Sequence, residues 1–406
     1  MKTIENKIID YMTDFFTPTE LGVMKKTYYH NYSFDDTVLT DPEYIQLSNL
    51  YKTLFGIAEE GRYRVEVNTN CSDLIKELFK RYVDEDTFVV STIENHPNVD
   101  DLIKNIPENK KILFCAGSKE QDNPDLINKI FDAYKKSGCK KVFVFICGVI
   151  VGFSYIIEQS FFNKLKNIFT QNNIPHIMAL DDCQGIFYVQ RDYSIFDAIF
   201  ATAHTLFLGF SMGILFTRLD KKLGFINKEG LKRFSEKLEI LNKHKNKIMQ
   251  FDGLLTEYFQ PVLDGKIFNH ASNTPSDYFT IQTENLKTFG KYINELMSKY
   301  NFIFNRMNVK KSWFRIRFHE SIIQEPEYFL QGLNRTKQIF GNSIRYNELG
   351  GKTLKENEEI KMYDMVATNL ELENKYFNYD NADILQQAKE MIIRRFGNSL
   401  DYIRQR

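Results

Sequence analysis

The sequence has no run of apolar residues long enough to cross a bilayer. Its longest such run, residues 142–153, falls well short of the roughly 20 residues that a membrane helix needs. The first residues, from Met1 to Glu5, have no apolar core of the kind that signal peptides carry. We therefore expect a protein that neither spans a membrane nor is secreted, and its predicted location is the cytoplasm.

The sequence also has no excess of charge of either sign. Lys and Arg together number 53, and so do Asp and Glu, which leaves a net charge of zero at neutral pH. Proteins whose main partner is a nucleic acid or an anionic membrane usually carry a strong basic excess. The even balance predicts that neither is the principal partner, although it is compatible with a local basic patch.

Cysteine is scarce, and several motifs that carry chemistry are absent. The five cysteines form no Cys-x-x-Cys pair, and their odd number favours free thiols in a reducing compartment over a disulfide framework. The chain has no Gly-x-Gly-x-x-Gly fingerprint, no P-loop, no His-Glu-x-x-His motif and no cluster of Cys and His ligands. Familiar dinucleotide, nucleoside-triphosphate and metal sites are therefore not predicted.

What the chain does have is length and an ordinary globular composition. With 406 residues, 43% of them hydrophobic and 26% charged, it can bury a large core and form two or three domains. Between Arg62 and Arg218, short apolar runs alternate with amphipathic stretches, which predicts a parallel sheet with helices on both faces. The expected strands cover residues 64–67, 88–90, 112–115, 142–146, 176–180, 195–201 and 213–217, and the expected helices cover 72–82, 125–136 and 159–171.

Other patterns lie on either side of this alternation. Before it, Asp41 and Pro42 form a typical helix start. After it, an apolar stripe at helical spacing predicts one long helix. Further strands are expected at 278–281, 301–307 and 313–318, and helices at 286–296, after Pro326 and at 381–396. The predicted division is an N-terminal helical segment (1–60), a large α/β domain (61–224), a connecting helix (225–258), a small α+β domain (259–340) and a C-terminal extension without an assigned role (341–406).

The segment from His176 to Arg218 holds the polar turns that point to function. The turn Asp181-Asp182-Cys183-Gln184 follows one apolar run, and Thr202-Ala203-His204-Thr205 follows the next. A third run begins at Gly213 and ends at Arg218. In parallel sheets, ligands bind at the carboxyl ends of the strands, where such turns lie. We therefore expect these turns to border a ligand site.

These turns resemble those of the fold type I PLP-dependent enzymes, in particular the class V aminotransferase and cysteine desulfurase group. That group carries Asp-x-x-Gln after one strand, Ser-x-His-Lys after a later one, and then a Gly-aliphatic strand that ends in Arg. The order and spacing are similar here, and the resemblance covers roughly residues 60–340. It implies a large α/β domain with a mainly parallel sheet, a smaller α+β domain, a homodimer, and PLP or its amine form PMP as cofactor.

The resemblance implies cofactor-binding roles for six residues, five of which lie in the turns after the strands and at one helix start. Asp181 would keep the pyridine nitrogen protonated, Gln184 would reach the ring hydroxyl, and Thr202 would bind the phosphate. Asn70 and Cys71 open a helix whose amides would also bind phosphate. By themselves, Asp181 and Gln184 could equally serve an ordinary turn. The group usually has Gly-x-Thr before the helix, and its absence here leaves Asn70 equally compatible with a plain N-cap.

Two further roles follow from the resemblance. His96 would stack on the pyridine ring, although one residue separates it here from Glu94, where the group has Glu-His-Pro. A plain loop histidine is the alternative. Arg315 would clamp a substrate carboxylate, but Arg317 lies on the same face of the expected strand and could serve instead, or both could line a solvated face.

One departure from the group bears on the chemistry. The enzymes of the group have a Schiff-base lysine that holds PLP and moves protons, and this sequence has Thr205 at the corresponding position. Another lysine could substitute, although the next ones along the chain, Lys221 and Lys222, follow a further strand. The cofactor could instead be held without a covalent bond, with His204 as the proton carrier, as a histidine is in some sugar dehydratases of this fold. The site could also be inactive.

The sequence therefore predicts an aminotransferase- or lyase-type enzyme with His204 and Thr205 at the catalytic position. It would bind PLP or PMP non-covalently and act on an amino acid or another amino-bearing substrate. An inactive homologue that binds a ligand or a protein partner is the alternative. A coincidental match in an unrelated doubly wound protein is a third hypothesis. No metal, nucleic acid or membrane is predicted to take part.

Overall fold

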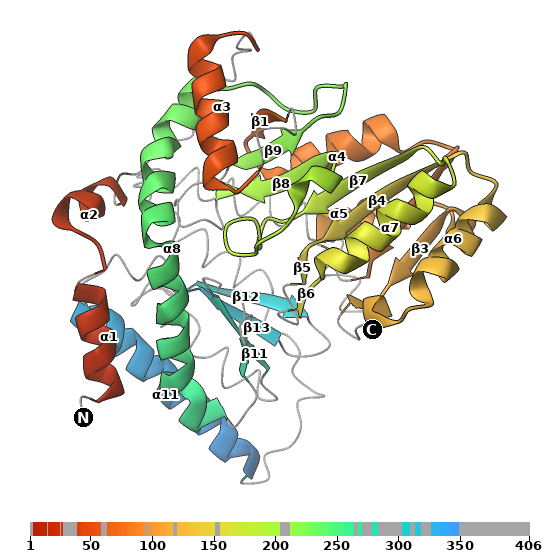
Figure 1. The fold of residues 1–406 in the computed structure, drawn as a ribbon. Helices are drawn as coiled ribbons and strands as arrows, with labels where there is room; N and C mark the ends of the chain where they lie inside the picture. The colour runs from red at the N-terminus through yellow and green to blue at the C-terminus, as the bar shows by residue number, and fades with distance from the viewer. Residues whose placement is uncertain are drawn as a thin grey trace, which may run out of the picture. The chain divides into compact units, whose positions relative to one another are not determined.

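The computed structural model (Figure 1) divides the chain into two compact units, residues 28–245 and residues 1–27 together with 246–406. The five-part division expected from the sequence stays a prediction. The structure describes residues 3–13, 15–24, 26, 39–57, 63–93, 95, 97–116, 120–150, 155–203, 212–263, 267–269, 278–282, 303–308, 313–317 and 326–348.

A seven-stranded sheet forms the centre of the unit 28–245. Its strands lie in the order β1-β9-β8-β7-β4-β2-β3, and β9 runs against the other six. The mainly parallel sheet predicted from the alternating runs is confirmed. The strands are β1 (Arg64–Asn68), β2 (Thr87–Thr92), β3 (Lys111–Phe114), β4 (Lys141–Cys147), β7 (His176–Asp181), β8 (Ala198–Thr202) and β9 (Gly213–Thr217), and a small hairpin is formed by β5 (Val149–Ile150) and β6 (Tyr155–Ile156).

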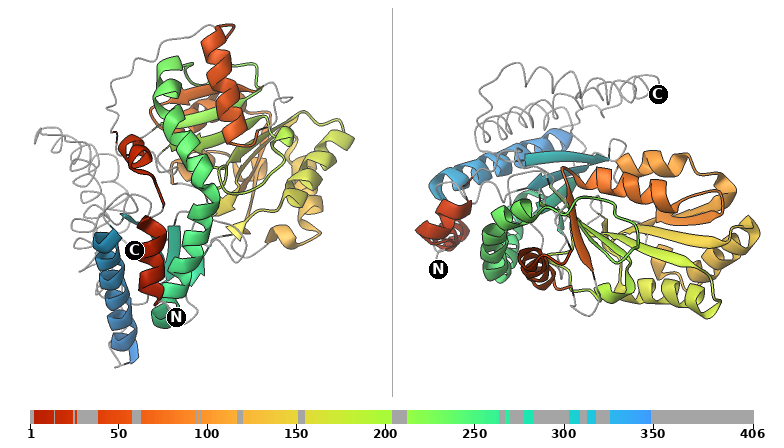
Figure 2. Two further views of the ribbon diagram at one scale, coloured as in Figure 1. Left: turned by 60° about the vertical axis from the view of Figure 1, so that its left-hand side comes forward. Right: turned by 90° about the horizontal axis from the view of Figure 1, so that it is seen from above.

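Helices cover both faces of this sheet (Figures 1 and 2), with α4 and α5 on one face and α6 and α7 on the other. Phe143 and Phe145 of β4 contact Phe79 of α4, with ring centroids 5.0 and 5.3 Å apart. On the other face, Phe88 of β2 contacts Tyr134 of α6 at 6.0 Å. Strands buried on both faces need apolar residues throughout, which explains their continuous apolar runs. These helices are α4 (Cys71–Tyr82), α5 (Pro97–Lys104), α6 (Leu126–Ser137) and α7 (Gln159–Gln171), and the short 3-10 helices are η2 (Glu108–Lys110), η4 (Glu120–Asp122) and η6 (Tyr193–Ile195).

One predicted strand begins later than expected. The apolar run 195–201 predicted a strand from Ile195, but η6 occupies Tyr193–Ile195 and β8 begins at Ala198. Asp192 starts the short helix because its carboxylate accepts a hydrogen bond from the Ser194 amide at 3.0 Å. The Asp197 carboxylate accepts a hydrogen bond from the Met178 amide at 2.8 Å, and the regular strand begins at the next residue, Ala198. Local polar contacts thus override the apolar pattern here.

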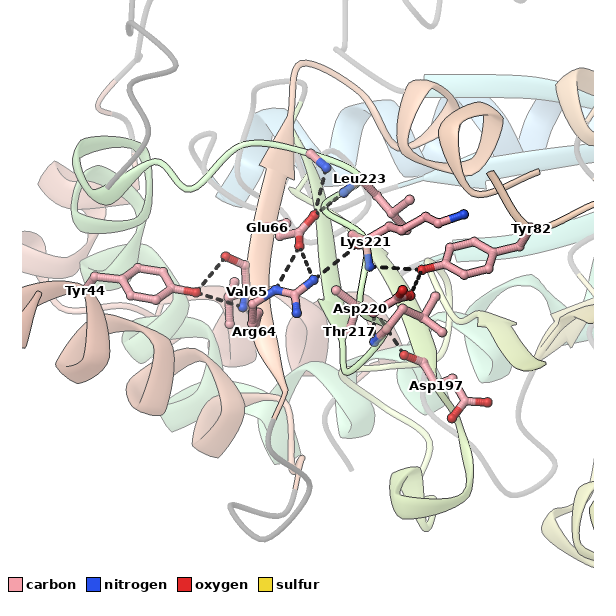
Figure 3. Close-up of polar contacts among 12 residues, drawn as sticks. Tyr44, Arg64, Val65, Glu66, Tyr82, Asp197, Thr217, Asp220, Lys221 and Leu223 are labelled. Carbon is pink, nitrogen blue, oxygen red and sulfur yellow. Dashed lines mark hydrogen bonds and ion pairs between the residues drawn. The ribbon is translucent and has the colours of Figure 1, made fainter. Parts of the chain in front are cut away.

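A buried carboxylate fixes the edge strand β1 (Figure 3). Glu66 is fully buried and accepts hydrogen bonds from the amides of Leu223 and Gly224 at 2.8 and 2.7 Å. The guanidinium of Arg64 contacts the other oxygen of Glu66 at 3.0 to 3.1 Å. Since a buried carboxylate is stable only when its hydrogen bonds are satisfied, these contacts tie β1 to the segment that follows β9.

Two further helices, α3 and the helix α8 that begins in this unit, agree with the predictions for the N-terminal region and for the long apolar stripe. α3 (Pro42–Leu54) begins where Asp41 accepts hydrogen bonds from the amides of Glu43 and Tyr44 at 2.9 and 3.0 Å. α8 (Lys228–Leu263) is the predicted long helix. The Tyr51 hydroxyl of α3 donates to the Leu231 carbonyl of α8 at 2.8 Å, which joins the two helices.

The second unit contains an antiparallel sheet and several helices. The predicted strands at 278–281, 301–307 and 313–318 are confirmed with small shifts at their ends. α1 contacts α11, and Tyr11 of α1 stacks on Phe251 at 5.3 Å. The helices expected at 286–296 and 381–396 lie outside the described residues. The elements are α1 (Ile4–Thr13), α2 (Pro18–Met24), the end of α8, α11 (Pro326–Glu348), and the strands β10 (Ile267–Asn269), β11 (Tyr278–Gln282), β13 (Trp313–Arg317) and β12 (Ile303–Asn308) in that spatial order.

Candidate functional site

The carboxyl ends of β1, β7 and β8 and the amino end of β9 lie along one edge of the seven-stranded sheet. Gly213, the first residue of β9, pairs with Asn68 of β1 on one side and with Thr202 of β8 on the other. One strand further along, Asp181 at the end of β7 pairs with Phe200 of β8. Two of the polar turns recognised in the sequence therefore follow neighbouring strands at the same edge.

The helix α4 begins beside these strand ends. Asn70 is its N-cap, and the side-chain oxygen of Asn70 accepts a hydrogen bond from the Asp73 amide at 2.9 Å. In return, the Asn70 amide nitrogen donates to the Asp73 carboxylate at 2.8 Å. This reciprocal cap is the plain N-cap that the sequence left open for Asn70. The remaining amides of the first turn and the helix dipole still favour the binding of an anion at the start of α4. The negative charge of the Asp73 carboxylate opposes such binding.

Gly213 allows the start of α4 to lie directly against β9. A Cβ atom at Gly213 would lie 2.5 Å from the Cys71 amide nitrogen and 2.6 Å from the Asn70 carbonyl carbon. Both are backbone atoms, which cannot move aside as a flexible side chain can. A glycine is therefore needed here for a close approach of backbones. The sequence showed Gly213 only as the start of a strand, because the contact joins segments far apart in the chain.

We expect Gly213→Ala to lower the free energy of unfolding by about 1–3 kcal/mol, since the added methyl group overpacks a rigid contact. Urea denaturation would measure the change. Gly253→Ala in α8 is the matched control, because a Cβ atom at Gly253 meets no heavy atom within 4 Å. In a helix interior that replacement should stabilise by about 0.5–1 kcal/mol. Equal effects at the two positions would contradict the close-approach explanation.

The two carboxylates after β7 have different surroundings. Asp181 is 8% exposed, and its carboxylate accepts a hydrogen bond from the Cys183 amide at 3.2 Å. Asp182 is fully buried and accepts a hydrogen bond from the Tyr193 hydroxyl at 2.8 Å. Of the two, Asp181 is the one that retains contact with solvent at the sheet edge. Gln184 is partly buried in the turn that follows.

Asp182 belongs to a buried polar cluster that sequence patterns did not indicate. The Arg191 guanidinium lies 3.5 Å from the Asp182 carboxylate and donates to the carbonyls of Ile157 and Gly148 at 2.7 and 2.6 Å. Burial raises the pKa of Asp182, while the neighbouring Arg191 and the Tyr193 hydroxyl lower it. One Asp182 oxygen and the Arg191 Nε atom have no hydrogen-bond partner among the described residues. The cluster fixes the turn that carries Asp181.

Three thiols surround the Asp181 turn. The sulfur atoms of Cys71 and Cys183 lie 3.4 Å apart, and Cys147 of β4 pairs in register with Asp181. The Cys147 thiol donates to the Val149 carbonyl at 3.0 Å. Burial raises the pKa of Cys147, and the nearby charge of Asp181 raises it further. Cys71, expected to contact a phosphate through its backbone, therefore also contributes a side chain to this cluster.

The turn after β2 is partly described. The Ser91 hydroxyl donates to the Phe145 carbonyl at 2.6 Å and accepts from the Asn95 side chain at 3.2 Å. Asn98 of α5 donates to the Ser72 hydroxyl at the start of α4, at 2.8 Å. These bonds bring the β2 turn toward the same helix start as the Asn70 cap. His96, in this turn, lies outside the described residues.

The remaining predicted site residues are described in part or not at all. His204 and Thr205 lie outside the described residues, so their predicted catalytic roles stay predictions. Arg315 lies in β13, in register with Thr280 of β11 and Asn305 of β12, and Arg317 is two residues further along the same strand. Their predicted role in binding a substrate carboxylate also stays a prediction.

Two searches of the described part of the chain gave no candidates. Among these residues, no group of three or more His, Cys, Asp or Glu side chains could hold a metal ion. None of the described helices combines the length and the apolar composition that crossing a membrane requires.

No protein-family model matches the chain, and no curated protein matches its sequence. Solved structures do match. A NifS-like protein from Rickettsia africae has 12% identity and a TM-score of 0.54, over 82% of this chain and 98% of that one. An ornithine aminotransferase from Toxoplasma gondii, with PLP at its active site, has 10% identity and a TM-score of 0.53, over 84% and 86%. A PLP-bound C–S lyase from Staphylococcus hominis has 11% identity and a TM-score of 0.52, over 80% and 90%.

At such low identity, these likenesses carry information about the fold and not about the activity. They extend over most of the chain, and they agree with a mainly parallel sheet flanked by helices. The α/β architecture implied by the turns around Asp181 and Thr202 is thus confirmed at the level of the fold. The chain has the fold of the fold type I PLP-dependent enzymes.

Proposed function

We propose that the protein binds PLP or PMP non-covalently at the edge formed by β1, β7, β8 and β9. There it would act as an aminotransferase- or lyase-type enzyme on an amino acid or another amino-bearing substrate. One observation carries the proposal. The Asp181 turn, Thr202 and the start of α4 lie at one edge of the sheet, in a fold shared with an ornithine aminotransferase and a C–S lyase that contain PLP.

The chemistry of these groups fits such a cofactor. PLP, when bound, supplies an electron sink for bonds at an amino-bearing carbon, and the sink is strongest when the ring nitrogen is protonated. Asp181 would hold that proton, because its carboxylate lies at the strand end. The Arg191 guanidinium pairs with the neighbouring Asp182 and not with Asp181. Thr202 and the first turn of α4 would bind the phosphate, and Gln184 would bind the ring hydroxyl.

The other residues of the site are proposed on the sequence resemblance. His96 would stack on the ring and Arg315 would bind a substrate carboxylate. His204 would move the proton that a lysine moves elsewhere, because imidazole exchanges protons near neutral pH. Thr205 stands in the lysine position and can form no Schiff base.

We also propose a homodimer that works in a reducing compartment such as the cytoplasm. The dimer rests on the resemblance. The compartment rests on cysteine usage, since all five cysteines are free thiols and disulfides are rare where glutathione and thioredoxin keep thiols reduced.

One feature favours the second candidate, an inactive homologue that binds a ligand or a protein partner. Asp73 places a carboxylate in the first turn of α4 and occupies the Asn70 cap. A negative charge at that position weakens the attraction of the helix start for a phosphate. Turnover that depends on added PLP or PMP would exclude this candidate.

Borohydride reduction distinguishes the lysine-less site from a site with a substitute lysine. Protein saturated with PLP is reduced, digested and mapped by mass spectrometry. The proposal predicts retention of PLP before reduction and no lysine modified in stoichiometric amount after it. A single lysine carrying one equivalent of the reduced cofactor would show that another lysine has taken over the role of the one replaced by Thr205.

A further inference from the structure

Two cysteines that are distant in the sequence meet beside the candidate site. Cys71 is the first residue of α4, and Cys183 lies in the turn after β7, 112 residues further along the chain. Their sulfur atoms are 3.4 Å apart, and both side chains are partly buried rather than sealed in the core. The thiols are therefore in contact with each other, and each residue keeps part of its surface exposed.

We propose that Cys71 and Cys183 are a site of reversible thiol oxidation, which forms one intramolecular disulfide across this edge of the sheet. A low-molecular-weight disulfide is the oxidant. The thiolate of one cysteine attacks it, releases one small thiol and forms a mixed disulfide. The second cysteine then attacks the protein sulfur and releases the other small thiol. The two protein thiols lose two electrons and two protons, and the reagent is reduced to two thiols.

The geometry favours this pair. A disulfide bond is about 2.05 Å long, so the two sulfurs must approach by about 1.3 Å. Cys183 lies in a turn and not in a strand or helix. Cys139 and Cys147, by contrast, are buried. The Cys147 thiol is also directed to the Val149 carbonyl.

The surroundings slow the reaction of Cys183 with an oxidant at neutral pH. The contact with Cys71, burial and the charge of Asp181 all raise the pKa of Cys183. Because the thiolate is the reacting form, a raised pKa slows the attack at neutral pH. Mildly alkaline solution should therefore speed the oxidation.

The disulfide would link the start of α4 to the turn that carries Asp181. If the proposed function is right, it joins the phosphate side of the cofactor site to the side that holds the ring nitrogen. This consequence rests on the proposed function, whereas the formation of the disulfide rests only on the contact between Cys71 and Cys183.

The test uses the reduced full-length chain, treated with hydroxyethyl disulfide at mildly alkaline pH and then alkylated under denaturing conditions. We expect free thiols to fall from five to three, with a peptide pair that links Cys71 to Cys183. Cys183→Ser should form no internal disulfide and should instead retain the reagent as an adduct on Cys71. Cys115→Ser is the control, because it should lose two thiols as the unmodified chain does.

Retention of all five thiols, a disulfide between other cysteines, or a persistent adduct without a Cys71–Cys183 link would each overturn the inference. PLP binding is measured on the reduced chain in parallel. A reduced chain that forms the disulfide but never binds PLP would refute the proposed function and leave the oxidation site established.

Discussion

Arg191→Met is expected to lower the free energy of unfolding by about 3–5 kcal/mol, because it leaves the buried Asp182 carboxylate without its counter-charge. Both side chains are almost completely buried, 2% exposed for Arg191 and 0% for Asp182. The substitution also removes the hydrogen bonds from Arg191 to the carbonyls of Ile157 and Gly148. Methionine retains much of the volume of the arginine side chain. The lost free energy of unfolding therefore reflects the missing charge and hydrogen bonds rather than a new cavity.

This loss should depend on pH. Burial already raises the pKa of Asp182, and Arg191 lowers it. Without Arg191 the pKa of Asp182 in the folded state rises further above its unfolded value of about 3.9. A raised carboxyl pKa destabilises the fold above the unfolded pKa, and the penalty disappears as the group is protonated. The deficit of Arg191→Met should therefore be greatest near neutral pH and shrink as the pH falls through the raised pKa of Asp182 toward the unfolded value.

The matched control is Arg81→Met. Arg81 contacts Glu77 at 3.3 Å, but their side chains are 45% and 32% exposed. Exposed pairs of this kind contribute about 0.5 kcal/mol or less. Urea denaturation of both variants across pH measures the difference. A deficit of Arg191→Met no larger than that of Arg81→Met, or one that grows on acidification, would contradict the assigned role of the cluster.

Asp181→Asn is expected to weaken PLP binding by about tenfold to a hundredfold, because a hydrogen bond to a charged group contributes about 1.5–3 kcal/mol. Asparagine keeps the shape of the side chain and can still accept the hydrogen bond that the Cys183 amide donates to Asp181. The substitution therefore removes the charge without disturbing the turn. Dissociation constants for wild type and variant, from fluorescence or absorption titration, measure the effect.

Asp101→Asn is the control for this experiment. Asp101 is 75% exposed in α5, and its carboxylate forms an exposed ion pair with Lys104. Its replacement should leave PLP affinity unchanged. If Asp181→Asn binds PLP as tightly as the wild type does, Asp181 does not hold the ring nitrogen. Circular dichroism of both variants checks that the fold is retained.

Much of the fold could be predicted because local patterns dominate it. The bounds of α7 and β9 were predicted correctly, since an amphipathic stretch and an isolated apolar run have clear ends. The opposite direction of β9 was not predicted, because strand direction depends on pairing partners that lie far apart in the sequence. Ile195 was wrongly placed in a strand, because its neighbours Asp192 and Asp197 bind backbone amides.

The candidate site was predicted less completely. The turns at Asp181 and Thr202 could be identified because their residue types follow the same order and spacing as the turns of the PLP-dependent enzymes that the chain resembles. The contacts that shape the site could not. Arg191 reaches the carbonyls of Gly148 and Ile157, and Cys71 reaches Cys183, only after the strands have assembled. No spacing in the sequence encodes such pairs.

The most direct test of the proposed function is an absorption titration of the purified chain with PLP, followed by PMP. We predict saturable binding of either form, with a shift of the ring band that Asp181→Asn diminishes. Absence of binding by both forms would contradict the account. The fold and the buried Asp182–Arg191 cluster would remain, and the inactive homologue would become the better description.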